Sequence, residues 1–303
     1  MATISVVISA YNEEKKIEEC LLSVKWADEI IFVDNSSTDA TAAIAKKYTK
    51  KIFKRLNNPM LNKNKNFGIR KATGDWILYM DADERVTSEL VKEIKSVVSR
   101  QSSDATGYWI PRKNIIFGKW IEYAGMYPDY QMRFFRRGKG EFPAEHVHEM
   151  IEIDGATEYL KENLVHYNFE TISQFLYKHI ELYAPNEAEN LTKKGYKLSY
   201  KDAIAMPLSE FLSRFFAREG YRDGLHGLVL SLLFSFYHLV IFAKIWERDG
   251  FKEYNQEDFF DGVSEQLKKG SDETLYWIAN EKIKYSKNPL EKASLMIERK
   301  MKS

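Results

Sequence analysis

The sequence contains one cysteine, Cys20, among its 303 residues. A single thiol excludes a disulfide framework and a cysteine-rich zinc site, and it favours a reducing, cytoplasmic setting. Net charge is nearly absent as well, because 45 lysines and arginines face 44 aspartates and glutamates. Since no basic field is available to hold a phosphate backbone, we expect no nucleic-acid partner.

Long hydrophobic runs are scarce. Residues 4–8 are mostly apolar but polar residues follow soon after, so we expect a buried strand there rather than a signal peptide. The longest run extends from Leu228 to Ala243. As a helix it would cover about 24 Å, less than the roughly 30 Å of a bilayer core. We therefore expect a helix that is buried in the protein or lies in a membrane surface.

Hydrophobic periodicity predicts alternating strands and helices over the first hundred residues. Strands are expected at 4–8, 30–33, 51–53 and 76–80, and helices at 13–24, 40–48, 62–72 and 87–98. This alternation is typical of βαβ units and of an α/β fold with a mostly parallel sheet.

The pattern changes after residue 100, first to irregular strands and then to helices. Helices are expected near 172–194, 207–219, 224–247, 256–268 and 272–284, with Pro207 and Gly220 as punctuation. We predict two domains, residues 1–170 and residues 171–303.

Acidic residues follow the second and fourth predicted strands, at Asp34, Asp39, Asp81 and Asp83. Open parallel sheets bind ligands outside the carboxyl ends of their strands. Asp81 and Asp83 are two positions apart, so on an extended chain their side chains point the same way. Such a pair can hold Mg²⁺ or Mn²⁺ and leave positions open for phosphate oxygens. The alternative is a solvated acidic turn that caps the next helix.

Four motifs in this order resemble the inverting family-two glycosyltransferases with the GT-A fold. They are VVISAYNE at 6–13, FVDNSSTD at 32–39, NFGI with ATGDW at 66–76, and MDADE at 80–84. The resemblance is strong over residues 3–100 and weaker over 101–170. Beyond 170 the chain is similar to lipopolysaccharide-core glucosyltransferases of bacteria. A GT-A sheet with helices on both faces is therefore expected, followed by a helical region.

The resemblance implies a nucleotide site and a divalent metal, Mg²⁺ or Mn²⁺. Tyr11 would pack by the base, Asp34 would bond the base edge, Asp81 would contact the ribose and Asp83 would hold the metal. Further implied nucleotide-binding residues are Ala10, Glu13, Asn66 and Ala82. The basic residue near the third motif stays open among Lys63, Lys65 and Arg70. The alternatives are an aromatic plug for Tyr11 and a turn residue for Asp34.

An inverting transfer needs a carboxylate that takes the proton of the acceptor hydroxyl. Residues 142–149, FPAEHVHE, form the densest titratable cluster. The resemblance implies a base after the Asp-X-Asp pair and favours Glu149, then Glu145, then Asp129, and we expect His148 as a metal ligand beside Asp83. An exposed polar strand is the alternative. His166 is a further candidate ligand, although a histidine beside aromatic residues is more often part of a core.

Several other residues have two interpretations. Arg133 could meet a phosphate or an acceptor sugar, or it could form surface ion pairs. Aromatic residues that could stack on sugar rings, or simply pack, are Trp109, Trp120, Tyr123 and Tyr127. Small residues recur along one face of the apolar helix, at Gly224, Gly227, Ser231, Ser235 and His238. That stripe suits close helix packing, in a membrane-surface or dimer module or in an ordinary helical subdomain.

The leading hypothesis is transfer of a hexose from a nucleotide-diphosphate sugar, UDP-linked in our prediction, to a glycolipid or lipid-linked acceptor. The expected location is the cytoplasm or the cytoplasmic face of the inner membrane, and a homo-oligomer is allowed. Alternatives are a polyisoprenyl phosphate or protein acceptor, and a non-catalytic nucleotide-sugar-binding scaffold.

Overall fold

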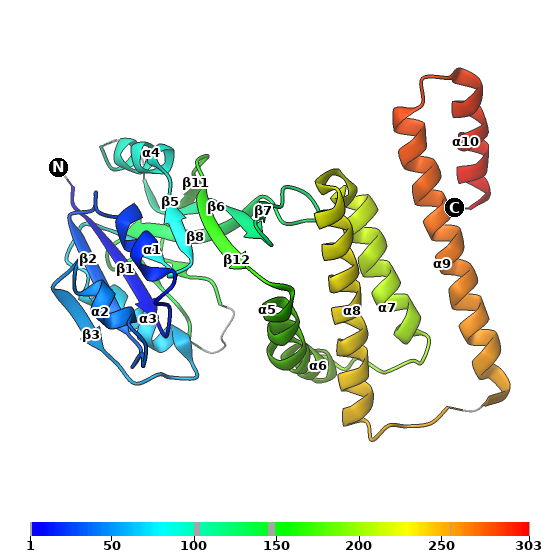
Figure 1. Cartoon of the computed structure of the whole chain (residues 1–303), viewed down its shortest axis with the longest axis horizontal. Coiled ribbons are helices and arrows are strands. Elements are labelled where there is room, and N and C mark those ends of the chain that lie inside the picture. The colour runs from blue at the N-terminus through cyan, green and yellow to red at the C-terminus, as the bar shows by residue number, and fades with distance from the viewer. Residues whose placement is uncertain (1, 100–103, 145–148, 255, 303) are drawn as a thin grey trace. The chain divides into compact units, whose positions relative to one another are not determined.

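The computed structural model describes residues 2–99, 104–144, 149–254 and 256–302. The chain divides into two compact units. The first consists of Met1–Ile116 and Tyr127–Asn168, and the second consists of Phe117–Met126 and Phe169–Ser303. Figure 1 labels most of the elements of both units.

Over its described residues, the first unit contains a large sheet and four helices. Its strands are β1 (Ile4–Ala10), β2 (Glu29–Asp34), β3 (Lys51–Lys54), β4 (Trp76–Met80), β5 (Glu84–Val86), β6 (Ala105–Ile116), β8 (Asp129–Arg136), β9 (Gly140–Glu141), β10 (Glu152–Ile153), β11 (Ala156–Tyr159) and β12 (Leu164–Phe169). Its helices are α1 (Ile17–Ser23), α2 (Thr41–Ala45), α3 (Leu61–Lys71) and α4 (Ser88–Ser99). Each element predicted in the first hundred residues is present, although α1 and α2 are shorter than expected.

The sheet has the order β3-β2-β1-β4-β8-β6-β12-β5. Its first four strands are parallel neighbours. Strand β8 is antiparallel to both β4 and β6, and β12 is antiparallel to β5. The predicted α/β fold with a following helical region is thus confirmed. Parallel order is concentrated where helices connect consecutive strands, because parallel neighbours need such crossovers.

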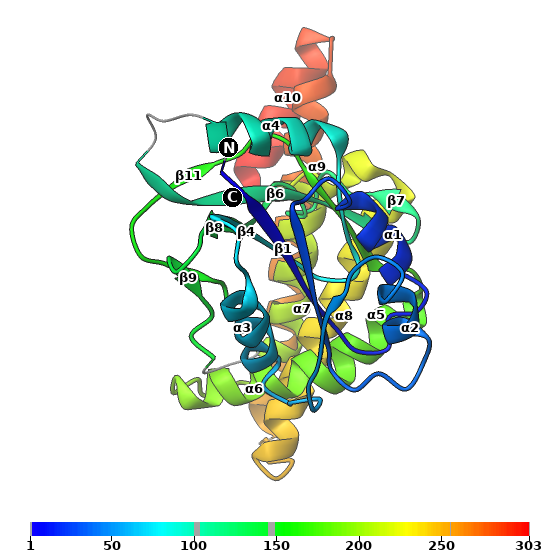
Figure 2. The ribbon, with the colours of Figure 1, turned by 90° about the vertical axis from the view of Figure 1, so that its left-hand side faces the viewer.

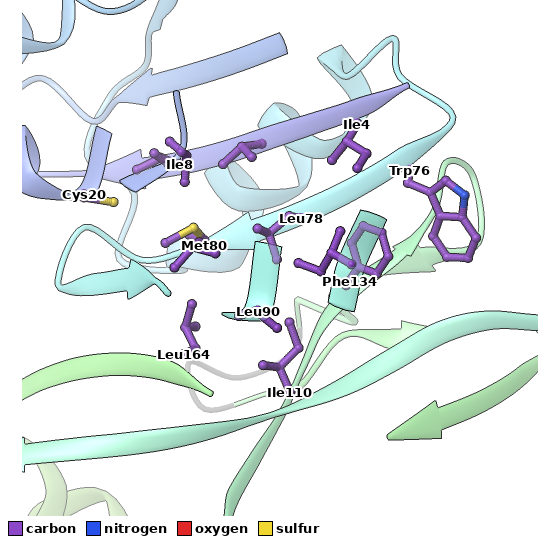
Figure 3. Packing of buried hydrophobic residues seen from close by; sticks show 14 of the residues in the cluster. Ile4, Ile8, Cys20, Trp76, Leu78, Met80, Leu90, Ile110, Phe134 and Leu164 are labelled. Carbon is purple, nitrogen blue, oxygen red and sulfur yellow. The ribbon is translucent and has the colours of Figure 1, made fainter. Parts of the chain in front are cut away.

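Alternation along β1 sends side chains to two separate hydrophobic layers. Val6 and Ile8 pack with α1, α2 and α4, whereas Val7 packs on the face that α3 covers. Figure 3 shows the first layer, in which Cys20 lies near Ile8 and Met80. The turned view in Figure 2 shows α3 apart from α1 and α2. Helices therefore cover both faces, as expected.

Gly68 lets α3 lie close to the sheet. A Cβ at this position would be 2.7 Å from Val7 Cγ1 and 2.9 Å from Val33 Cγ2. Both distances are shorter than ordinary van der Waals contact, so any side chain would push the helix outward. The close approach fixes the distance of α3 from β1 and β2.

The second unit is mainly helical. It contains β7 (Lys119–Trp120), α5 (Ile172–Tyr177), a π-helical turn (Lys178–Tyr183), α6 (Ala184–Lys193), α7 (Asp202–Leu212), a second π-helical turn (Ser213–Ala217), a 3-10 turn (Gly220–Asp223), α8 (Leu225–Arg248), α9 (Gln256–Tyr285) and α10 (Pro289–Met301). Two predicted boundaries were wrong. Pro207 lies inside α7 rather than at a helix start, and α9 continues through the expected break near 269–271.

The small-residue stripe of α8 packs within the second unit. A Cβ on Gly227 would lie 1.8 Å from the Gly220 carbonyl oxygen. The Ser235 hydroxyl donates to the Pro207 carbonyl at 2.7 Å. Close helix packing is thus its use inside this chain.

Another face of α8 is apolar and exposed. Its large exposed side chains are Leu225, Leu232, Phe236, Leu239 and Trp246. By length and composition α8 could cross a membrane, and only 33% of its most apolar stretch is buried in the protein, but a single such helix is a weak indication.

Candidate active site

The carboxyl ends of β1, β2 and β4 meet at one edge of the sheet. Ala10 is paired with Asp34, and Ile8 is paired with Met80. The loops that follow these three strands therefore begin side by side. This is where a parallel sheet offers a crevice to ligands.

A cleft of about 370 Å³ lies at this edge. Six of the residues predicted for the nucleotide and metal site line it: Ala10, Tyr11, Glu13, Asp81, Ala82 and Asp83. Lys65 of α3 and His166 of β12 complete its charged wall. The cleft thus brings together residues that are distant in the sequence.

Asp81 is held by three neighbours. Its carboxylate lies 3.2 Å from Lys65 Nζ and 2.6 Å from an Arg133 guanidinium nitrogen, and it accepts a 2.9 Å hydrogen bond from the Tyr79 hydroxyl. Burial alone would raise the pKa of Asp81, but Lys65 and Arg133 hold this pKa well below its usual range. Asp81 is therefore a fixed anion at neutral pH.

Asp83 faces His166 across the cleft. Its carboxylate oxygen is 3.5 Å from His166 Nε2, and His166 Nδ1 lies 2.7 Å from the Asn114 side-chain oxygen. Burial opposes ionisation, yet the hydrogen bond from His166 lowers the pKa of Asp83 below its usual value. His166 is buried, as a core histidine would be, but its free edge points at the carboxylate.

A buried ionic network lies beside Asp81 and Asp83 and holds the side chains that contact them. Glu84, which is fully buried, lies 2.9 Å from Arg133 and 3.2 Å from Arg112. Arg112 continues to Asp129 at 2.6 Å, and Asn114 donates to the same carboxylate at 3.1 Å. Burial disfavours the charge of Asp129, but Arg112 and Asn114 lower its pKa overall. Asp129, third among the predicted bases, is thus committed to structural ion pairs.

Sequence reasoning missed Glu84, Arg112 and Asn114 as parts of this site. Glu84 directly follows the Asp-Ala-Asp motif, which is a signal that could have indicated it. Arg112 and Asn114 are two positions apart on β6 and share one face, but nothing in the sequence showed that β6 lies two strands from β4.

The three basic candidates near the third motif all belong to α3, but they line two different clefts. Lys65 lines the cleft beside Asp81. Lys63 and Arg70 line a different cleft, where Arg70 forms an ion pair with Glu141.

Two predicted nucleotide-binding residues are not among those lining the 370 Å³ cleft. One carboxylate oxygen of Asp34 accepts the Ser37 amide at 3.0 Å, which is the turn geometry that was the alternative. The Asn66 side chain makes two hydrogen bonds to the Phe142 backbone. Its Nδ2 donates to the Phe142 carbonyl at 2.8 Å, and its Oδ1 accepts from the Phe142 N–H at 2.9 Å. Asn66 thereby fastens α3 to the segment before the His-Glu cluster.

Glu149 lines a third cleft, of about 850 Å³. Its carboxylate accepts hydrogen bonds from the Asn62 side chain at 2.8 Å and from the Ala144 amide at 2.6 Å. Asn62 belongs to the first turn of α3, one turn before Lys65, so this helix connects Glu149 to the 370 Å³ cleft. Glu145 and His148 lie outside the described residues.

Within the part of the chain that the structure describes, no group of three or more histidine, cysteine or acidic side chains is placed to hold a metal ion. Asp83 and His166 form a pair of candidate ligands. A pair fits Mg²⁺ or Mn²⁺, because these ions commonly take few protein ligands and complete their shell with substrate phosphates and water.

Comparisons with known proteins agree with this arrangement. The glycosyl transferase family 2 profile matches residues 5–154. An uncharacterised glycosyltransferase of Rickettsia felis is 30% identical over 262 residues, covering 82% of this chain and 90% of that protein. The lipopolysaccharide core biosynthesis glycosyltransferase LpsC of Rhizobium meliloti is 26% identical over 255 residues, covering 82% and 94%.

Among solved structures, Staphylococcus aureus TarS in complex with UDP is 18% identical with a TM-score of 0.44, covering 84% of this chain and 93% of that one. The family resemblance seen in the sequence motifs is confirmed by the matched profile and by the Rickettsia felis relative, which the chain matches over most of both lengths. The chain belongs to glycosyl transferase family 2 and is a glycosyltransferase.

Proposed function

We propose that this enzyme transfers a hexose, with inversion and with help from a divalent metal, from a UDP-sugar to a lipopolysaccharide-type glycolipid. The observation that carries the proposal is the meeting of Asp81, Asp83, Lys65 and His166 in one cleft at the carboxyl edge of a parallel sheet. The similarity to LpsC supports the choice of acceptor.

The donor end of the reaction uses residues of the 370 Å³ cleft. Tyr11 is 42% exposed and is available to lie against the base, while Asp81 contacts the ribose. Lys65 supplies a positive charge near the diphosphate. Asp83 and His166 would hold the metal, whose positive charge would offset that of the leaving diphosphate. His148 stays a predicted additional ligand.

Glu149 serves as the general base in this proposal. The acceptor oxygen attacks the anomeric carbon from the face opposite the diphosphate, and its proton passes to the Glu149 carboxylate. The bond between the anomeric carbon and the diphosphate oxygen breaks, and its electron pair leaves with UDP. Hydrogen bonds from the Asn62 side chain and the Ala144 amide hold the Glu149 carboxylate in one orientation.

A membrane-surface role for α8 follows from the same acceptor. We propose that its exposed apolar face, defined by Leu232, Phe236, Leu239 and Trp246, rests in the lipid interface. An aromatic residue near the end of such a face is typical of interfacial anchors. Wild-type protein should co-sediment with anionic liposomes, and Leu232→Asp with Phe236→Asp should abolish this. A dimer that dissociates in the double variant, without liposome binding, would instead identify a protein interface.

The test of the catalytic proposal is a donor panel. The protein is incubated with Mn²⁺ and UDP-glucose, UDP-galactose or UDP-N-acetylglucosamine, and released UDP is measured. We expect UDP release from one donor, and we expect it to be lost in Asp83→Ala and in the presence of a chelator. The matched control is Asp104→Ala, because Asp104 is exposed and does not line the 370 Å³ cleft, and release should be kept there. Release that is equal in Asp83→Ala would contradict the proposed metal site.

A further inference from the structure

Three aromatic side chains gather on adjacent strands of the first unit. The rings of Trp109 on β6 and Tyr159 on β11 are stacked with centroids 6.2 Å apart. Tyr130 on β8 meets Tyr159 edge to face at 4.8 Å. Tyr159 is 61% exposed and Tyr130 is 36% exposed. We call Trp109, Tyr130 and Tyr159 the aromatic platform.

The platform borders the cleft that contains Glu149. Trp109, Met132 and Thr157 line this 850 Å³ cleft on the sheet side, and Glu149 and Glu152 line it as well. The Trp109 indole N–H points to the Thr157 hydroxyl at 3.4 Å, which orients the ring beside the cleft. Trp109, the platform residue that lines this cleft, and the proposed base therefore share one cleft.

The lining chemistry selects among ligands. Two carboxylates, Glu149 and Glu152, disfavour a phosphate or another anion by charge repulsion. A purely apolar ligand would leave these carboxylates and the Thr157 hydroxyl without new partners. A neutral sugar ring avoids both the charge repulsion and the loss of polar partners. Its C–H face packs on an aromatic ring, while its hydroxyls bond to carboxylates and hydroxyls.

We propose that the cleft binds a neutral pyranose ring of the acceptor, stacked on the aromatic platform, and so presents a hydroxyl to Glu149. This proposal rests on the role of Glu149 in the proposed function, and it adds the chemical class of the acceptor unit. The acceptor is then recognised through an uncharged sugar rather than through a phosphate or the lipid. Trp109 is the principal contact, and Tyr159 and Tyr130 extend the surface.

Saturation-transfer NMR tests the proposal without knowledge of the full acceptor. The probes are the methyl glycosides of glucose, galactose and mannose at millimolar concentration, added to the full chain with UDP and Mn²⁺. We expect transfer to at least one pyranoside, a reduction of fivefold or more in Trp109→Ala and in Tyr159→Ala, and substantial retention in Trp109→Phe. The exposed Tyr285→Ala serves as a matched control and should leave the signal unchanged.

The outcomes separate the two proposals. A thermal shift with UDP and Mn²⁺ should be the same in wild type and in every platform variant, because none of these residues lines the donor cleft. Absence of transfer from all three pyranosides, or equal transfer in Trp109→Ala, would overturn the platform. Absence of the UDP shift in wild type, with pyranoside transfer intact, would contradict the donor site and leave the platform standing.

Discussion

Replacing Arg133 by methionine should destabilise the first unit strongly. The Arg133 side chain is 6% exposed and its main buried partner, Glu84, is 0% exposed. Methionine has a similar volume but no charge, so it would leave Glu84 with Arg112, 3.2 Å away, as its remaining cation. Breaking a buried ion pair in this way costs about 3–5 kcal/mol. The Asp81 carboxylate is 30% exposed and keeps Lys65, so its share of the loss is smaller.

A double-mutant cycle separates this loss from simple changes in packing. We expect Arg133→Met and Glu84→Gln each to lower the free energy of unfolding. Their combination should be less destabilising than the sum by about 1–3 kcal/mol, because the pair is removed together. Urea unfolding followed by tryptophan fluorescence measures all three variants. The exposed Arg136→Met on the same strand is the matched control and should change stability by less than about 1 kcal/mol.

Additive losses in this cycle would refute the reasoning. They would mean that Glu84 and Arg133 do not interact across the sheet, and hence that the network under Asp81 is not formed. A small loss in Arg133→Met alone, below about 1 kcal/mol, would lead to the same conclusion.

Three further predictions concern separate parts of the chain. Lys65→Ala should weaken UDP binding roughly tenfold by calorimetry, whereas Lys63→Ala, in the other cleft, should leave it unchanged. Gly68→Ala should lower the free energy of unfolding by about 1–3 kcal/mol, and an unchanged urea midpoint would show that α3 can move away without loss. Burial lowers the pKa of His179 to about 4 from its ordinary value of 6.5. Between pH 4 and pH 6.5 the unfolded chain therefore binds more protons than the folded chain. Stability should therefore fall by about 1–2 kcal/mol from pH 7 to pH 5, and by less in His179→Phe, while equal pH dependence in both proteins would contradict the burial argument.

The fold of the first hundred residues could be predicted because each strand and helix carries its own periodicity. Parallel βαβ order then follows from chain connectivity, and it places Asp81 and Asp83 at the correct edge. The later strands were harder, because β8 and β6 join the sheet through pairings far apart in the sequence. Glu84, Arg112 and Asn114 acquire their roles only through those pairings.

Local patterns were also insufficient for α7 and α9. Pro207 was expected to begin a helix, yet it lies inside α7, where its carbonyl accepts the Ser235 hydroxyl of α8. A break was expected between residues 268 and 272, but α9 continues through it, and a Cβ on Gly270 would be 2.0 Å from Leu208 Cδ2, so the glycine allows close helix contact. Tertiary packing overrides intrinsic preference at both positions.

Asp34 and Asn66 illustrate a different limit. Their residue types suit a nucleotide site, but short polar side chains also bond readily to nearby backbone. In the structure Asp34 accepts the Ser37 amide and Asn66 holds Phe142. A motif specifies which residue stands at a position, whereas its hydrogen-bond partners depend on the folded surroundings.

The central claim is that Asp83 and His166 hold a divalent metal together with the donor diphosphate. Calorimetric titration of UDP into the protein, with Mn²⁺ and then with chelator, tests it most directly. The account predicts that UDP binds tightly in the presence of Mn²⁺. The affinity for UDP should fall at least tenfold when chelator is added, and by the same factor in Asp83→Asn. UDP binding of the same affinity with and without the metal, or unchanged in Asp83→Asn, would contradict it.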